Sequence, residues 1–224
     1  MKTYECIVLT YNVPHRKTYD TLCRLKALGY SSVLVLAVDL HYKKTFKPIY
    51  EHRPPVILDI MPEVLCKNLG YEFVYSPNGY EKFNYAENIP ILVCGAGIIP
   101  EEIVKRYRII NSHPGFIPLA RGLDALKWSI VEKIPIGVTS HLIGNEIDAG
   151  EIIERKKIAV YSNDTFHSVA QRVYDTEIEL LVGALDKLEE KHIIVSGGDN
   201  PVHKRMQKEI ESNLLCLFEE YKKN

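Results

Sequence analysis

Short apolar runs alternate with segments of helical periodicity along the first half of the chain. An uninterrupted apolar run predicts a strand that is buried on both faces, whereas apolar residues three or four positions apart predict an amphipathic helix. Glycine ends two of the helical segments, at Gly29 and Gly70. We therefore predict strands over 6–9, 32–38, 71–74, 91–94 and 108–111, and helices over 19–28, 61–69 and 100–107.

The second half predicts two more strands, a long helix and a tail of different character. Strands are expected over 137–143 and 151–160, and a helix over 165–189. Strands that alternate with helices indicate an α/β fold, and we expect a Rossmann-like three-layer sandwich with a mostly parallel sheet. We expect residues 1–190 to form this domain, and residues 191–224 to form a short C-terminal extension made of a strand, a turn and one amphipathic helix.

Charge and composition narrow the class of protein. The 28 lysines and arginines balance 29 aspartates and glutamates, so the net charge is −1. A nucleic-acid-binding domain is usually strongly basic, so we expect no nucleic-acid partner. The longest apolar stretch, 89–100, is shorter than the roughly 20 residues that cross a bilayer, so we expect no membrane span. Five scattered cysteines and the lack of a recognisable signal peptide favour the cytoplasm.

Two common kinds of site are disfavoured. Gly95-Ala96-Gly97 follows a predicted strand, but a dinucleotide fingerprint needs a third glycine where Pro100 stands. The two glycines more simply let the backbone turn at a strand end, where open α/β sheets bind ligands. The eight histidines form no His-x-His or His-x-x-x-His pair, and no Cys-x-x-Cys pair accompanies them. We therefore expect neither a nicotinamide or flavin cofactor nor a metal site.

Polar residues that suit acyl transfer follow two of the predicted strands. Asn111 and His113 are two positions apart at a strand end, so their side chains share one face of the strand. Asp148 comes just beyond another strand. Together they supply an amide donor, a group that titrates near neutrality and a carboxylate that biases it, which are the parts that acyl transfer to an amine requires. A polar cluster with a purely structural role uses the same residue types.

The segments that carry these residues resemble a known family. The sequence NSHPGFIP over 111–118 and the sequence EIDAG over 146–150 resemble the signature of the folate-dependent formyltransferases. The intervening segments 121–128 and 137–141 also follow the pattern of that family, and the resemblance extends over about 91–160. The family includes glycinamide ribonucleotide transformylase, methionyl-tRNA formyltransferase and the sugar N-formyltransferases.

The resemblance implies a catalytic set and a formyl donor. Asn111, His113 and Asp148 would be catalytic, and His141 would hold the aspartate. The acceptor amine would attack the formyl carbon of 10-formyltetrahydrofolate directly, with Asn111 and a protonated His113 stabilising the oxyanion and Asp148 relaying the proton. The implied folate-binding residues lie in two loops and one helix: Gly97, Ile98, Ile99, Val104, Asn145, Glu146, Ile147 and Asp148.

The acceptor is inferred from where the chain departs from the family pattern. Glycinamide ribonucleotide transformylase has a small glycine-rich phosphate loop after its first strand, which 10–18 does not match, and the methionyl-tRNA enzyme has a larger C-terminal barrel than 191–224 provides. We therefore expect a nucleotide-linked amino-deoxy sugar, as in surface polysaccharide synthesis, with glycinamide ribonucleotide as the alternative. Candidate substrate contacts are Asn12, His15, Arg16, Lys17, Arg121 and Arg205.

Other assignments remain open at this stage. A folate-binding module without turnover is disfavoured because it does not need all three catalytic residues. A formyl hydrolase shares the catalytic set but usually carries an additional N-terminal domain, which we do not recognise here. The apolar stripe of the terminal helix, which includes Leu214 and Phe218, could seal a homodimer or pack back on its own domain.

Overall fold

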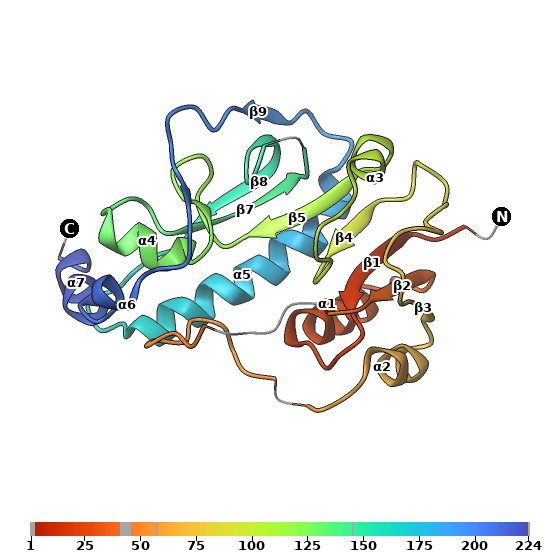
Figure 1. The fold of residues 1–224 in the computed structure, drawn as a ribbon, viewed down its shortest axis with the longest axis horizontal. Helices are drawn as coiled ribbons and strands as arrows, with labels where there is room; N and C mark the ends of the chain where they lie inside the picture. The colour runs from red at the N-terminus through yellow and green to blue at the C-terminus, as the bar shows by residue number, and fades with distance from the viewer. Residues whose placement is uncertain (1–2, 41–45, 57, 145, 224) are drawn as a thin grey trace. The chain divides into compact units, whose positions relative to one another are not determined.

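The computed structural model describes residues 3–40, 46–56, 58–144 and 146–223 (Figure 1). It has an α/β fold, and its residue contacts divide the chain into two compact units. The first unit comprises Met1–Lys43 and Pro55–Asn111, and the second comprises Lys44–Pro54 and Ser112–Asn224. The predicted boundary at residue 190, between a catalytic domain and an extension, is a different division of the chain and stays a prediction.

The first unit is built on parallel strands. β1 (Cys6–Tyr11) pairs with β2 (Val33–Val38) on one side and with β4 (Ile91–Val93) on the other. β3 (Glu72–Ser76) pairs with β2, and β5 (Ile109–His113) pairs with β4, all in parallel register. All six residues of β2 are buried, as expected for a strand covered on both faces. The predicted α/β fold with a mostly parallel sheet is confirmed.

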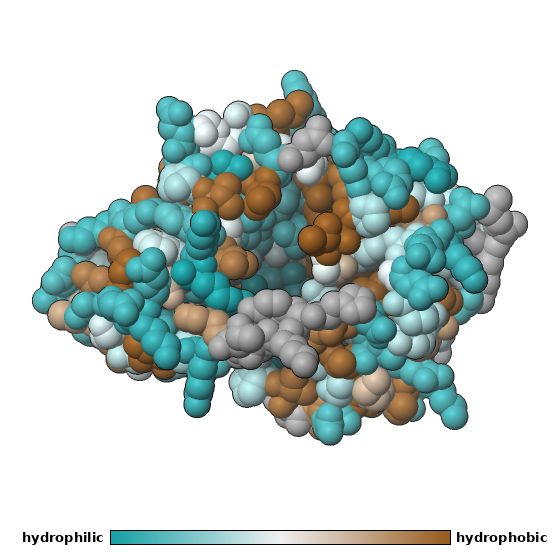
Figure 2. Space-filling model, in the orientation of Figure 1, coloured by the Kyte–Doolittle hydropathy of each residue, from teal (hydrophilic) through white to brown (hydrophobic). Residues whose placement is uncertain are grey.

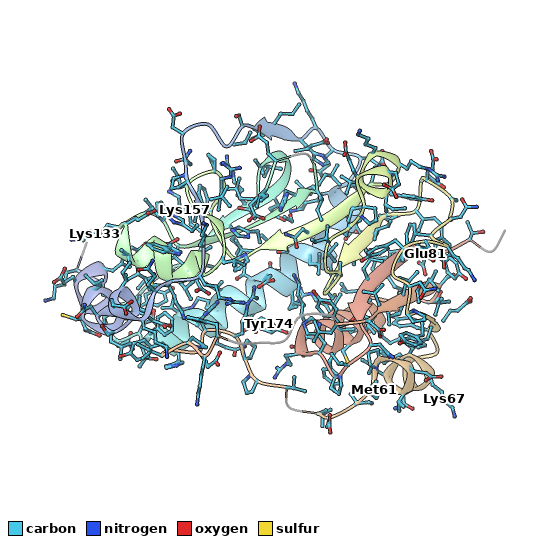
Figure 3. The ribbon with its side chains drawn as sticks, in the orientation of Figure 1. Met61, Lys67, Glu81, Lys133, Lys157 and Tyr174 are labelled. Carbon is cyan, nitrogen blue, oxygen red and sulfur yellow. The ribbon has the colours of Figure 1, made fainter. Side chains whose placement is uncertain are left out.

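The described residues of the first unit include three helices. α1 (Arg16–Ala27) packs on α2 (Pro62–Leu69), and α2 packs on β3; Figure 3 labels Met61 at the start of α2 and Lys67 in its last turn. α3 (Glu101–Arg106) connects β4 to β5. α1 begins three residues before the predicted start, because the ion pair between Arg16 and Asp20 supports a first turn that has no apolar periodicity.

The second unit packs a long helix on an antiparallel sheet. β7 (Gly137–Leu142) pairs with β8 (Gly150–Lys157), and β8 pairs with β9 (Ile193–Val195). α5 (Phe166–Lys187) packs on β7 and β8, and its N-terminus is closed by a capping box of Thr165 and Ser168. Figure 3 labels Tyr174 on α5, and this residue is buried.

The tail is part of the core of the second unit. β10 (Val202–His203) pairs with β6 (Arg121–Gly122), and α4 (Ala125–Val131) packs on α7 (Leu214–Tyr221). The single terminal helix predicted from the sequence is two helices, because α6 (Lys208–Glu211) ends before α7 begins. Leu214 and Phe218 are buried in the hydrophobic core around α5, so the apolar stripe of α7 packs on its own unit.

Candidate active site

His113 ends β5 and is almost completely buried, with 5% of its surface exposed. Its Nε2 lies 3.0 Å from the carbonyl oxygen of Ala120. A carbonyl oxygen can only accept a hydrogen bond, so this contact fixes the proton on Nε2. The other ring nitrogen, Nδ1, is therefore the one that can take up or release a proton.

Asp148 lies against that second nitrogen. Its Oδ1 is 3.4 Å from Nδ1 of His113, and its Oδ2 accepts a 2.8 Å hydrogen bond from the backbone N–H of Gly122. The backbone of Asp148 has φ 45°, a left-handed conformation that aspartate tolerates better than most residues. The turn before β8 thus holds the carboxylate where it stabilises a proton on Nδ1 of His113.

His141 approaches the same carboxylate from β7. Its Nε2 lies 3.8 Å from Oδ1 of Asp148, while its Nδ1 lies 3.2 Å from the carbonyl oxygen of Leu142. A β-bulge between Ser140 and His141 shifts the register of β7 against β8. Such a bulge re-aims a side chain. The structure therefore brings three of the predicted residues, His113, His141 and Asp148, into one cluster within the second unit.

Burial and charge act in opposite directions on His113. Desolvation is the larger effect and lowers the pKa of His113, whereas the Asp148 carboxylate and the Ala120 carbonyl raise that pKa, and the net shift is downward. The resemblance to the formyltransferases implies a protonated His113. Asp148 does favour the charged form, but burial outweighs it, so the imidazole is neutral near pH 7.

Asn111 and the second predicted folate-binding loop are placed less completely. Asn111 is half-buried and lies two positions before His113 in β5, at the end of the first unit. Asn145 lies outside the described residues. The carboxylate of Glu146 accepts a 3.0 Å hydrogen bond from the N–H of Gly197, and the side chain of Ile147 is 63% exposed.

The first predicted folate-binding loop follows β4 and is held by two tyrosines. The Gly97 N–H donates to the Tyr11 hydroxyl at 3.0 Å, and the Tyr80 hydroxyl donates to the Ala96 carbonyl at 2.7 Å. Gly95 has no room for a side chain, because a Cβ there would stand 2.5 Å from the Tyr11 ring. Beyond this fixed turn Ile98 is 94% exposed, and the two remaining predicted residues, Ile99 and Val104, are half-buried.

Ile98 is an almost fully exposed isoleucine that follows a fixed turn. Figure 2 shows hydrophobic residues as small patches among hydrophilic ones on the face that it draws. Single exposed apolar residues are common on protein surfaces. Ile98 differs because the backbone just before it is held by two hydrogen bonds, one donated by Gly97 to the Tyr11 hydroxyl and one donated by the Tyr80 hydroxyl to Ala96.

The predicted substrate contacts in the first unit surround the start of α1. Asn12 donates its N–H to the Val38 carbonyl at 2.9 Å, and Lys17 is half-buried in the first turn of α1. Nδ1 of His15 lies 2.9 Å from the Thr18 hydroxyl, and Arg16 binds Asp20 and the Pro55 carbonyl. His15 and Arg16, which we expect to bind phosphate, therefore already make hydrogen bonds within the first unit. A pocket of about 200 Å³ adjoins this point, lined by His15, Arg16, Thr18, Tyr19, Val56, Leu58, Ile60, Pro62 and Leu65.

The two predicted contacts in the second unit are also engaged within it. Nη1 of Arg205 lies 3.5 Å from Oδ1 of Asp124, and its guanidinium stands over the Phe46 ring. Arg121 is buried and donates to backbone carbonyls beside Asp148. The sequence did not indicate that the backbone groups of Ala120 and Gly122 orient His113 and Asp148. The only signal for these two residues was their position beside the motif.

Known proteins are similar to the segment of the chain that carries this cluster. The family model described as formyl transferase matches residues 82–185. This segment, less than half of the chain, is similar to the formyl transferase family. The matched segment includes Asn111, His113, His141 and Asp148, and it ends before the tail that begins near residue 191.

Relatives and solved structures of this family are similar to parts of the chain. The dTDP-4-amino-4,6-dideoxyglucose formyltransferase of Mycobacterium tuberculosis is 36% identical over 89 residues, which are 40% of this chain and 38% of that protein. A 4-N formyltransferase from Francisella tularensis has a TM-score of 0.61 at 20% identity, covering 93% of this chain and 87% of its own.

A third comparison is a structure from Helicobacter canadensis, an N-formyltransferase in complex with folinic acid and dTDP-3-aminofucose. It has a TM-score of 0.63 at 15% identity and covers 91% of this chain and 71% of its own. At this identity the two solved structures show the shared fold. The chain spans less than half the length of the curated formyl transferase relative that it matches.

Proposed function

We propose that the protein is an N-formyltransferase that moves a formyl group from 10-formyltetrahydrofolate to the amine of a nucleotide-linked amino-deoxy sugar. The observation that carries the proposal is the pair of His113 and Asp148, in which Nδ1 faces a carboxylate oxygen at 3.4 Å while Nε2 is committed to a carbonyl. The match of residues 82–185 to the formyl transferase family model supports the reaction class.

The proposed chemistry uses a neutral His113 as the proton acceptor. The donor supplies a formyl carbon that an amine can attack, and the attacking nitrogen loses a proton as the new C–N bond forms. Because burial keeps the pKa of His113 low, Nδ1 is free to accept that proton near pH 7. Asp148 then stabilises the imidazolium, and the buried position of the pair strengthens that interaction. Proton transfer from His113 to the departing nitrogen completes the exchange.

Asn111 and His141 have supporting roles in this proposal. Asn111 shares a face of β5 with His113, so its amide can donate to the oxygen that becomes negative in the transition state. His141 contacts Asp148 on the oxygen that faces His113, so it limits the rotation of the carboxylate. We assign catalysis to Asn111, His113 and Asp148, and positioning to His141.

We propose separately that Ile98 of the first unit and Ile147 of the second unit contact the donor. Ile98 follows the fixed turn of Gly97, and Ile147 precedes Asp148, and both side chains are largely exposed. Flat heteroaromatic rings bind well against such apolar groups when nearby backbone groups pair with the polar ring edge. Ile99 and Val104 of the first unit and Glu146 of the second unit are the other described residues for which we propose a donor contact. The name of one similar structure includes folinic acid.

The acceptor is proposed from the basic start of α1 and from the relatives. The name of the similar Mycobacterium tuberculosis protein includes a dTDP-linked amino sugar. His15 and Lys17 lie at the N-terminus of a helix of 12 residues, where backbone N–H groups favour a phosphate.

We also propose a role in surface polysaccharide synthesis and a cytoplasmic location. A homodimer stays a prediction. Within the described residues, no helix is both long and apolar enough to span a bilayer.

A panel of acceptors tests the proposed function. The full chain is incubated with 10-formyltetrahydrofolate and, separately, with dTDP- and UDP-linked amino-deoxy sugars and with glycinamide ribonucleotide. Formylation of a nucleotide-linked sugar is expected, and the same reaction is expected to be lost in His113→Ala. Turnover of glycinamide ribonucleotide alone would assign the protein to purine synthesis, and turnover of none, with hydrolysis of the donor, would indicate a formyl hydrolase.

A further inference from the structure

Arg121 is a buried cation whose hydrogen bonds go to the backbone around Asp148. It is 6% exposed. Its Nε lies 2.9 Å from the carbonyl oxygen of Ile147 and 3.2 Å from that of Asp148, and its Nη2 lies 2.7 Å from the Ile147 oxygen. Its contact with the Glu146 carboxylate is longer, at 3.9 Å. The planar fork of a guanidinium fits several carbonyls at once, which a lysine cannot do.

The same guanidinium also binds the tail. Its Nη1 donates to the carbonyl oxygen of Asn200 at 3.1 Å, and Gly197 lies directly against it. A Cβ on Gly197 would stand 1.8 Å from Nη1, so only glycine allows the guanidinium its present position. The Gly197 N–H adds a second link, because it donates to the carboxylate of Glu146, two residues before Asp148.

The carboxylate of Asp148 is tied to the tail through Gly122. The Gly122 N–H donates to Oδ2 of Asp148 at 2.8 Å, and Gly122 pairs with His203 between β6 and β10. Gly122 has φ 85°, and a Cβ there would stand 2.3 Å from the His203 carbonyl oxygen. The backbone and the side chain of Asp148 are therefore both fixed by groups that the tail holds in place.

We propose that Arg121 and the turn formed by residues 197–200 of the tail position Asp148 for catalysis. In this proposal the tail contributes to the geometry of the active site. The proposal rests on the proposed function. In it Arg121 is a positioning residue, because it contacts the backbone of Asp148 and leaves the reacting atoms to His113 and the Asp148 carboxylate. The hydrogen bonds from Arg121 stabilise the left-handed backbone of Asp148, a conformation that is unfavourable for a residue other than glycine.

Gly197→Ala tests the proposal without removing any functional group. The added methyl group forces the Arg121 guanidinium to move, while its charge and every residue near His113 are retained. Gly183→Ala on α5 is the matched control, because a Cβ there meets nothing within 4 Å. We expect kcat to fall by about tenfold to a hundredfold in Gly197→Ala, as for other small displacements of a catalytic group. Gly183→Ala should keep the original kcat.

A second measurement separates positioning from a loss of stability. His113 is titrated by NMR in isotopically labelled protein, in the parent chain, in Gly197→Ala and in Arg121→Ala. Displacing the Asp148 carboxylate removes a negative charge from beside His113, so the pKa of His113 should fall further in both variants. The titration of His192, whose ring binds the Glu151 carboxylate and the Lys187 carbonyl, should stay the same.

Each outcome bears on the proposal. A reduced kcat together with a lower His113 pKa supports it. An unchanged His113 titration in both variants overturns it, even where thermal stability falls, because stability alone would then explain the contacts. The NMR titration does not depend on turnover. If the parent chain transfers no formyl group but the His113 pKa still shifts, the positioning of Asp148 stands and the proposed reaction fails.

Discussion

Replacing Asp148 with asparagine isolates the contribution of its charge. Asparagine has nearly the same shape and can still accept the hydrogen bond from the Gly122 N–H, so the turn that holds it should persist. What is lost is the negative charge 3.4 Å from Nδ1 of His113. The variant therefore asks how much of the reaction depends on stabilising a proton at that nitrogen.

The structure sets the size of the expected effect. For unit charges at the 3.4 Å separation and an effective dielectric constant of about 20, the Coulomb energy is about 5 kcal/mol. Because His113 and Asp148 are both largely buried, solvent screening reduces this little. One power of ten in rate corresponds to about 1.4 kcal/mol. We expect kcat to fall by about a thousandfold, which allows for partial replacement of the interaction by the asparagine amide.

The assay is formyl transfer measured over a range of pH. In the parent chain, the rate should fall on the acid side only below about pH 6.5, because the pKa of His113 is lower than its ordinary value. In Asp148→Asn the acid limb should move to lower pH, since losing a neighbouring negative charge lowers the pKa of a histidine further. A variant that keeps more than a tenth of the parent kcat would refute the role of the Asp148 charge.

Three further predictions concern the tail, a buried histidine and the donor site. Lys127→Met should lower the free energy of unfolding by about 3–5 kcal/mol, because it leaves the buried Glu211 carboxylate without its cation; Lys156→Met, in an exposed pair, should cost less than about 1 kcal/mol by urea denaturation. The free energy of unfolding should fall as the pH drops from 6.5 towards 3, because burial lowers the pKa of His52 to about 3 and the unfolded chain therefore takes up the proton first. His52→Leu should flatten this dependence of the unfolding free energy on pH. An unchanged slope in that variant would contradict the assignment to His52. Ile98→Asp should raise the KM for the formyl donor by about tenfold to a hundredfold, whereas a comparable charge at the exposed Leu28 should leave it unchanged, and equal effects of the two would remove Ile98 from the donor site.

Elements whose residues are apolar along their length could be predicted from the sequence. β2 and α5 lie where their patterns placed them, because local periodicity and burial agree there. α4 was missed although it is a regular helix over Ala125–Val131. Its buried face includes Lys127, whose partner Glu211 lies 84 residues away, so the pattern reads as polar until the tail is placed.

The candidate site likewise has residues that could be predicted from the sequence and groups that could not. His113, His141 and Asp148 could be predicted because they stand in motifs, and the structure brings them together. The groups that set their chemistry could not be predicted. The Ala120 carbonyl and the Gly122 N–H are backbone groups that every residue has, and the burial that lowers the pKa of His113 depends on the packing of the whole unit. Arg121 has the charge expected of a substrate contact, and only its buried carbonyl partners show that it binds the Asp148 turn.

The central claim is that His113 and Asp148 carry out formyl transfer to an amine, and a single-turnover label transfer tests it most directly. The full chain is mixed with 10-formyltetrahydrofolate labelled in the formyl carbon and with the amino-sugar nucleotide selected from the acceptor panel, and the products are followed by mass spectrometry. Our account predicts that the label appears in a formamide on the sugar with the parent chain, and that it stays on the donor with His113→Ala. Equal transfer by the two proteins would contradict it.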